Sequence, residues 1–183
     1  LGTVALAGHL IALNLCSISF MVPLGLSTTA AVRVGQAIGR DDVRAARQAA
    51  LVAYAMGIGF MALSALTFAC IPHWLAGLYT GDLAVANVAA RLLLVGAVFQ
   101  VFDGAQTIGI GALRGAADTR LPMFVTIVAY WVVGLPLGWS LAFRCGQGPA
   151  GLWWGLTSGL TLVALMLGWR FYVRVRPDRL AEL

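Results

Sequence analysis

Charge is scarce in this 183-residue chain, and one basic side chain is missing altogether. Only 10% of the residues are charged, against about 25% in an ordinary soluble domain, and the twelve basic residues are all Arg. Hydrophobic residues make up 61% of the sequence. A compact domain of this length cannot bury so much apolar surface, so the composition excludes a water-soluble globular protein and indicates contact with lipid.

Cysteine is also sparse, with Cys16, Cys70 and Cys145 far apart and each in or beside an apolar run. A disulfide scaffold needs a dense, even set of cysteines, and disorder needs low hydrophobicity with high net charge, so both classes are excluded. The formal net charge is +5. Because the Arg residues gather between apolar runs, we interpret them as determinants of membrane orientation and do not expect nucleic-acid binding.

Five apolar stretches are long enough to cross a bilayer, which takes about 20 residues of helix. They cover residues 4–32, 49–71, 92–113, 121–143 and 151–173. The alternation of polar and apolar residues that marks a membrane β-barrel is not seen. The predicted fold class is therefore an all-α integral membrane bundle of five transmembrane helices, followed by a cytoplasmic tail at 174–183.

The distribution of Arg predicts the orientation of these spans. Ten of the twelve lie in three regions that the spans place on one side, and only Arg91 and Arg144 lie on the other. The positive-inside rule makes the Arg-rich side cytoplasmic, so we expect a multi-pass protein of the inner (plasma) membrane with a cytoplasmic C-terminus. Leu1 would then lie outside, and because it is not an initiator Met we expect at least one upstream helix.

Polar residues between the first two spans, at 33–48, predict a short interfacial helix capped by Asp41 and Asp42. Small residues recur at spacing four in the later spans and predict close helix packing: Gly111 with Gly115, Gly134 with Gly138, and Gly155 with Gly159.

Pro23 and Pro136 each interrupt the hydrogen-bond ladder in the middle of a span. They predict kinks and are hinge candidates, although a kink that is merely tolerated remains the alternative.

Asp103 lies near the middle of the third span, where an ionised Asp costs about 2.5–3.5 kcal/mol on insertion scales and should face protein or a water-filled cavity. Phe99, Gln100, Gln106 and Thr107 stand three or four positions away and share or border its helix face. Such a group could bind a proton, a sodium ion or a cationic substrate. The alternative is a structural hydrogen bond to a neighbouring helix.

Enzymatic signals are weak. Ser158 has no evident base, and His9 and His73 lack metal-ligand spacing, so we expect neither catalysis nor a metal site beyond a possible Na⁺ at Asp103.

Four segments, in this order along the chain, resemble the C-terminal half of the MATE (multidrug and toxin extrusion) family, with its NorM-like branch closest. The resemblance runs from about Ala5 to Tyr172. Its most specific elements are RVG, a mid-span FQ-x-x-D and LRG-x-x-DTR-x-P, within residues 21–39, 99–123, 129–139 and 151–160.

Members of that family have twelve helices in two six-helix lobes, and they export organic cations and drugs, including antibiotics, in exchange for Na⁺ or H⁺. The resemblance implies that the five spans are helices eight to twelve, most of the C-terminal lobe, so the seventh helix and the N-terminal lobe would come from a longer chain. It also implies that Asp103 is the acidic residue of the cavity used for cation coupling and substrate binding, with Phe99, Gln100 and Gln106 around it. No cofactor is implied besides the coupling ion. Ala117 stands where the family commonly has Gly, and there we expect only a stiffer turn.

Two other functions stay open. A flippase for lipid-linked precursors, from the same superfamily, would need several cavity Arg or Lys residues for phosphate, whereas the lone acid favours a cationic cargo. A non-transporting membrane module that assembles with a partner is compatible with the small-residue faces. The sequence leaves open the substrate range, the choice of Na⁺ or H⁺, and the oligomeric state.

Overall fold

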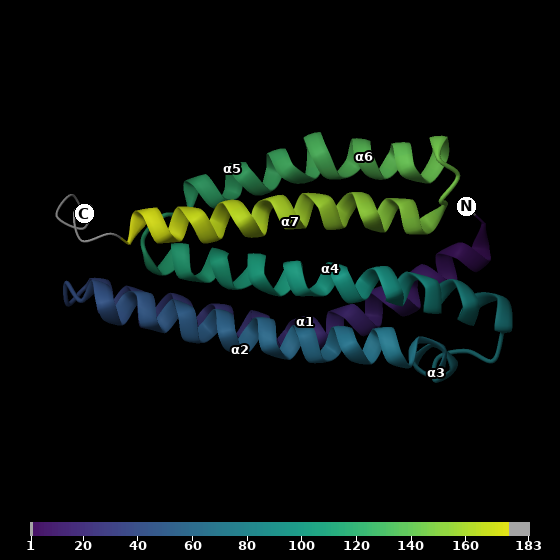
Figure 1. Cartoon of the computed structure of the whole chain (residues 1–183), viewed down its shortest axis with the longest axis horizontal. Helices are drawn as coiled ribbons and strands as arrows, with labels where there is room; N and C mark the ends of the chain where they lie inside the picture. The colour runs from purple at the N-terminus through teal and green to yellow at the C-terminus, as the bar shows by residue number, and fades with distance from the viewer. Residues whose placement is uncertain (1, 176–183) are drawn as a thin grey trace.

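The computed structural model describes residues 2–175, which form a bundle of helices with no strand among them (Figure 1). Five segments of this range are long and apolar enough to cross a membrane, which confirms the predicted fold class. Two short π-helical segments, η1 and η2, are part of the fourth span. The elements are α1 (Thr3–Ile38), α2 (Val43–Cys70), α3 (Pro72–Gly77), α4 (Leu83–Gly115), α5 (Arg120–Val128), η1 (Ala129–Gly134), α6 (Leu135–Trp139), η2 (Ser140–Arg144) and α7 (Pro149–Arg174).

Two of the long helices, α2 and α4, begin at an aspartate cap. The Asp42 carboxylate accepts a hydrogen bond from the backbone N–H of Ala45, and Asp82 caps α4 in the same way. Asp42 therefore caps the second span itself. The separate interfacial helix predicted at 33–48 is wrong, because these residues complete α1 and begin α2. The short helix α3, which starts at Pro72, was not predicted.

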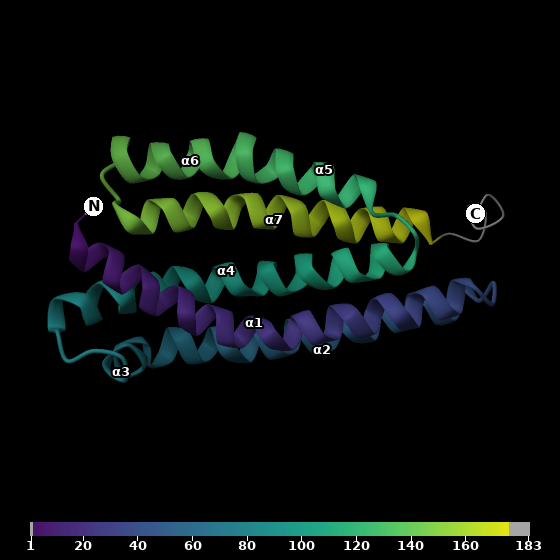
Figure 2. The same ribbon diagram turned by 180° about the vertical axis from the view of Figure 1, so that it is seen from behind.

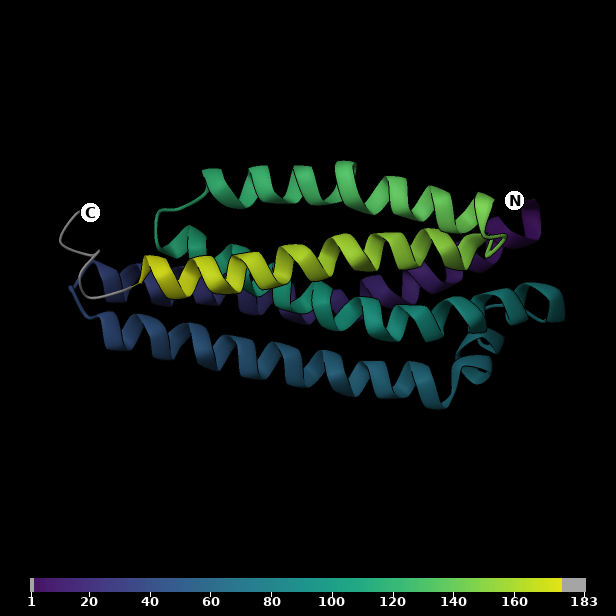
Figure 3. The ribbon, with the colours of Figure 1, turned by 45° about the horizontal axis from the view of Figure 1, so that its top comes forward.

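Helix α4 occupies the centre of the bundle and contacts α1, α2, α3 and α7. The fourth span, from α5 to η2, packs on α7 on the side away from α1 and α2, as Figures 1 and 3 show. In the described part of the chain, four apolar clusters lie in the interior, and two of them are much larger than the others. Of these two, one surrounds Leu113 and Leu167, and the other surrounds Leu93 and Trp153. The middle of α4, with its polar residues, lies between these clusters.

The Arg-rich regions gather at one end of the bundle. The α1–α2 turn, the α4–α5 turn and the end of α7 lie there, while α3 and the η2–α7 loop lie at the other end (Figure 2). The Arg170 guanidinium forms a 2.7 Å ion pair with Asp118, and the Nε of Arg47 donates to the carbonyl of Val175. Arg176, Arg179 and most of the predicted tail lie outside the described residues, as does Leu1.

The turn after α4 is a Schellman motif with a non-glycine residue at its left-handed position. The N–H of Asp118 bonds to the carbonyl of Leu113, and the N–H of Ala117 bonds to that of Arg114. Ala117 has φ +55°, a conformation that costs an L-residue about 1–2 kcal/mol. The expectation that Ala117 only stiffens the turn was therefore incomplete, since the side chain also strains it.

The predicted small-residue pairs do sit where helices approach closely. A Cβ on Gly155 of α7 would overlap the backbone of Gly138, and one on Gly159 would come within 3.0 Å of the Ala129 carbonyl oxygen. On the other side of the bundle, Gly111 of α4 faces the backbone of Ser27 in the same way. These glycines let α7 contact the fourth span, and α4 contact α1, through their backbones.

We expect Gly155→Ala to destabilise the protein because the added methyl must push α7 away from Gly138, at a cost of about 1–3 kcal/mol. The measurement is the thermal unfolding temperature of the full-length protein that contains this chain, purified in detergent. Gly168→Ala is the matched control in the same helix, because a Cβ there meets nothing within 4 Å. Equal unfolding temperatures for the two variants would contradict this packing.

Candidate functional site

Asp103 lies on the central helix α4, about midway between two Arg residues. Arg91 and Arg114, toward the two ends of α4, stand 12 and 11 positions away. At 1.5 Å per residue these positions are each about 17 Å from Asp103 along the helix axis. In a hydrocarbon core about 30 Å thick, the carboxylate is therefore near the midplane. The side chain is half-buried, and within residues 2–175 no hydrogen bond or ion pair to it is recorded.

Gln100 points from α4 toward α1 and α2. Only 1% of Gln100 is exposed, and its Oε1 accepts a 3.3 Å hydrogen bond from the hydroxyl of Ser64 on α2. The Ser64 hydroxyl in turn lies 2.8 Å from the hydroxyl of Ser19 on α1. The buried Nε2 of Gln100 has no hydrogen-bond partner. Three helices thus meet in one chain of polar side chains beside the Asp103 position.

Gln106 and Phe99 face the opposite neighbours. The Tyr130 hydroxyl, on η1, donates to Gln106 Oε1 over 3.4 Å, and the Phe99 ring lies 5.3 Å from the ring of Trp153 on α7. The face predicted around Asp103 is therefore divided, with one amide held by α2 and the other by η1. Asp103 stands between them on α4, three positions from each amide.

Thr107, the hydroxyl predicted on this face, takes part through its backbone. Its carbonyl accepts a 2.7 Å hydrogen bond from the hydroxyl of Ser27 on α1. This bond fixes α1 against α4 one turn beyond Asp103, at the level where Gly111 allows the two backbones to meet.

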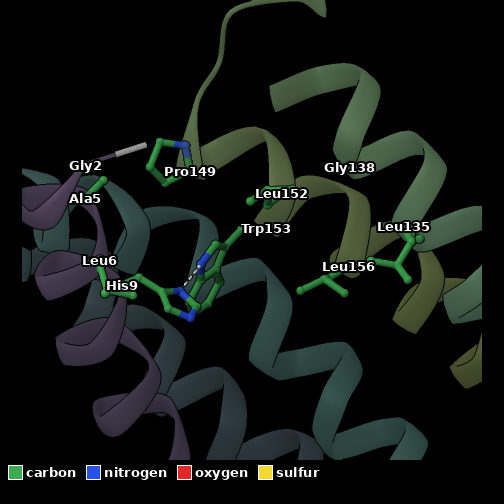
Figure 4. Close-up of a pocket in the computed structure, with 11 residues that line it drawn as sticks. Gly2, Ala5, Leu6, His9, Leu135, Gly138, Pro149, Leu152, Trp153 and Leu156 are labelled. Atoms are coloured by element: carbon green, nitrogen blue, oxygen red, sulfur yellow. Dashed lines mark hydrogen bonds between the residues drawn. The ribbon is translucent and has the colours of Figure 1, made fainter. Parts of the chain in front are cut away.

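A largely apolar pocket of about 460 Å³ opens near the end of the bundle opposite the Arg-rich turns, between the start of α1, α6 and the start of α7 (Figure 4). Asp103 does not line it. The indole N–H of Trp153 donates a 3.1 Å hydrogen bond to Nδ1 of His9 across the pocket, as the dashed line in Figure 4 shows. Since Trp153 also contacts Phe99, this aromatic group connects the pocket to the surroundings of Asp103.

The two prolines lie in different settings. Pro23 is buried within α1, and because it has no N–H the carbonyl of Ser19 loses its α-helical partner. Figure 2 shows α1 changing direction along its length. Pro136 lies in α6 between η1 and η2, so the fourth span departs from α-helical geometry on both sides of it. The kinks are real, whereas the hinge role stays a prediction.

Ser19, Ser64, Tyr130, Trp153 and His9 are the neighbours that sequence reasoning did not place at the site. Each comes from another helix, and the contacts join positions 24 to 144 residues apart. Their only sequence signal was polarity within an apolar run, which hydroxyls bonded to their own helix share. Ser158 is such a case, since it donates to the carbonyl of Trp154.

The arrangement suits binding of a positively charged species. A carboxylate and amide oxygens are ligands that a proton or a hard cation accepts, and the aromatic rings beside them favour organic cations. The described guanidinium groups lie toward the two ends of the bundle, so none is placed to neutralise Asp103 at its depth.

Comparison with known proteins agrees with this architecture. The model of the MatE family matches residues 1–140. The multidrug resistance protein NorM of Burkholderia vietnamiensis is 49% identical over 179 residues, which cover 95% of this chain and 39% of that protein. The probable multidrug resistance protein NorM of Brucella suis biovar 1 is 44% identical, over 91% of this chain and 36% of that protein.

Among solved structures, the eukaryotic MATE transporter AtDTX14 superposes with a TM-score of 0.80 at 22% identity, covering 96% of this chain and 40% of that one, which shows a shared fold. The chain spans about two fifths of the length of the curated relatives it matches. From the family match over most of its length and the NorM relatives, this multi-pass membrane chain belongs to the MatE family.

Proposed function

We propose that this chain forms most of the C-terminal lobe of an ion-coupled multidrug exporter, in which Asp103 binds the coupling ion and the organic cation in turn. The relatives named above are multidrug resistance proteins, and this chain matches about two fifths of their length. The observation that carries the proposal is the lone Asp103 carboxylate at the midplane, without a recorded ion pair in residues 2–175.

Charge balance explains why binding would be exclusive. An ionised carboxylate near the bilayer centre is costly, and one positive charge removes most of that cost. Protonation, a bound Na⁺ or a cationic drug would each neutralise Asp103, and two of them together would leave an excess charge. Competition at a single carboxylate therefore couples the entry of an ion to the release of a drug, which is the requirement for antiport.

The surroundings of Asp103 favour organic cations over anionic cargo. Phe99 stands one helical turn before Asp103 on α4, and its ring contacts that of Trp153. Such aromatic surface attracts flat or quaternary cations. A lipid-linked phosphate would instead require cationic groups in the cavity. Because the described Arg residues lie toward the two ends of the helices, the flippase alternative has no matching site in this part of the molecule.

Export would proceed by alternating access between this lobe and the N-terminal lobe of a longer chain, with the seventh helix completing the lobe described here. Pro23 and Pro136 are the hinge candidates. The departure from α-helical geometry around Pro136 and the loss of the Ser19 carbonyl bond at Pro23 lower the cost of bending at these points. The coupling ion would be H⁺ or Na⁺, and the proposed transport needs no cofactor besides it.

We further propose that the Arg-rich end faces the cytoplasm and that the protein resides in the inner (plasma) membrane. The grouping of the Arg-rich turns at one end of the bundle supports this orientation through the positive-inside rule.

Replacing Asp103 by Asn should abolish ion-coupled drug efflux while leaving insertion into the membrane intact, because the amide fills the same space without the exchangeable charge. The measurement is efflux of a fluorescent organic cation from cells expressing the full-length protein. Asp82→Asn is the matched control on the same helix, since Asn also caps helices well. Wild-type efflux in the Asp103 variant would contradict the proposal.

The orientation can be read from a natural cysteine. Cys145 is exposed and follows η2, at the end opposite the Arg-rich turns. Cys70 is exposed at the same end, beside α3, and is first replaced by Ala. In spheroplasts, a membrane-impermeant maleimide should then label the full-length protein at Cys145, and Cys145→Ala should remove that label. In the variant without both cysteines, a cysteine introduced by Arg40→Cys should react only after the membrane is broken. The reverse pattern would show that the Arg-rich end lies outside.

A further inference from the structure

Three hydrogen-bonded side chains, Ser19, Ser64 and Gln100, connect α1, α2 and α4. They can form a second hydrogen-bond arrangement besides the one described above. Hydroxyl groups can donate or accept, and the amide of Gln100 can turn by 180° and exchange the places of Oε1 and Nε2. In the arrangement described, Ser19 donates to Ser64, Ser64 donates to Oε1, and Nε2 is left buried without a partner.

Turning the amide reverses the direction of each hydrogen bond among these three side chains. Nε2 then donates to Ser64, Ser64 donates to Ser19, and the Ser19 hydroxyl donates to the carbonyl of Leu15, which lies 3.3 Å from it. This arrangement makes three hydrogen bonds where the other makes two. It pairs the buried nitrogen with Ser64 and leaves Oε1, in place of Nε2, at the free edge of the amide.

The two arrangements present different atoms at the free edge of the amide. With Nε2 bound to Ser64, the free atom is Oε1, which is a ligand for a proton donor or a hard cation. With Oε1 bound to Ser64, the free group is an N–H donor, which suits an ionised carboxylate. Gln100 and Asp103 are three positions apart on α4, so the amide and the carboxylate are neighbours on the helix.

We propose that Ser64 and Ser19 are positioning residues that set the orientation of the Gln100 amide for the ion site at Asp103. When a cation occupies the site, the chain runs from Gln100 to Leu15 and Oε1 faces the ion. When the cation leaves, the chain reverses and Nε2 faces the ionised Asp103. This inference rests on the proposed role of Asp103, but its parts all lie among α1, α2 and α4 of the described structure.

The distribution of burial fits a device that responds to the site and not to solvent. Ser19 is 9% exposed and Gln100 is 1% exposed, so bulk water does not compete strongly for their hydrogen bonds. Pro23, on the same helix, leaves the carbonyl of Ser19 without an α-helical N–H to bind. The hydroxyls of Ser19 and Ser64 lie 2.8 Å apart, so the direction of one hydrogen bond fixes the direction of the next.

The test is the dependence of drug efflux on the coupling ion in the full-length protein. Removing the hydroxyl with Ser64→Ala should raise the ion concentration needed for half-maximal efflux about tenfold, the usual effect of losing a group that orients a ligand, with a smaller change in maximal rate. Ser64→Thr keeps a hydroxyl and should restore the wild-type value within about twofold. Ser19→Ala should shift it in the same direction by less.

Two comparisons separate this role from a merely structural one. Ser17→Ala is the matched control, because Ser17 is exposed and bonds only to Leu13 of its own helix among recorded contacts. Since Ser64 is proposed to act through Gln100, combining Ser64→Ala with Gln100→Leu should shift ion dependence no further than Gln100→Leu alone. Additive shifts, or wild-type ion dependence in both Ser64→Ala and Ser19→Ala, would overturn the inference.

The same assay distinguishes a failure of the proposed function from a failure of the positioning role. If Asp103→Asn keeps ion-dependent efflux in the same assay, the role of Asp103 is wrong. If Asp103→Asn loses efflux while the serine variants retain the wild-type half-saturating ion concentration, only the positioning role is wrong.

Discussion

A carboxylate in the middle of a membrane-spanning helix, with no ion pair within residues 2–175, is the constraint on which the rest of this structure depends. Helix α4 packs against α1, α2 and α7, and α2 and η1 bring polar side chains to the two amides that flank Asp103. The apolar clusters above and below keep those polar groups confined to one layer. The proposed exchange follows from the free-energy cost of an ionised carboxylate near the bilayer centre, because any single cation bound to Asp103 lowers that cost.

Close packing makes this layer possible. Gly111 on α4 lets its backbone approach α1, so that the short side chain of Ser27 can reach the carbonyl of Thr107. At the Arg-rich end, the Asp118–Arg170 ion pair and the bond from Arg47 to the carbonyl of Val175 tie α7 to the α4–α5 turn and to α2. These two contacts hold α7 against its neighbours at the Arg-rich end, whereas bending of α1 and the fourth span at the two prolines stays a prediction.

Much of this could be predicted from the sequence, because a bilayer imposes length and polarity directly on each span. The five spans, the small-residue contacts and the candidate residues around Asp103 were all visible as local patterns. Helix ends were not, since single caps such as Asp42 override hydropathy. The division of Gln100 and Gln106 between opposite neighbours could not be foreseen either, because it depends on which helix packs where. The left-handed conformation at Ala117 could not be predicted, because Ala does not favour positive φ.

The most direct test of the account is competition at equilibrium. The affinity of the purified full-length protein for a fluorescent organic cation would be measured over a range of pH and, separately, of Na⁺ concentration. The account predicts that affinity falls as one of these ions increases, and that Asp103→Asn removes this competition. If the wild-type affinity is independent of both ions, or if competition persists in the Asp103 variant, exchange at this carboxylate is not how the protein works.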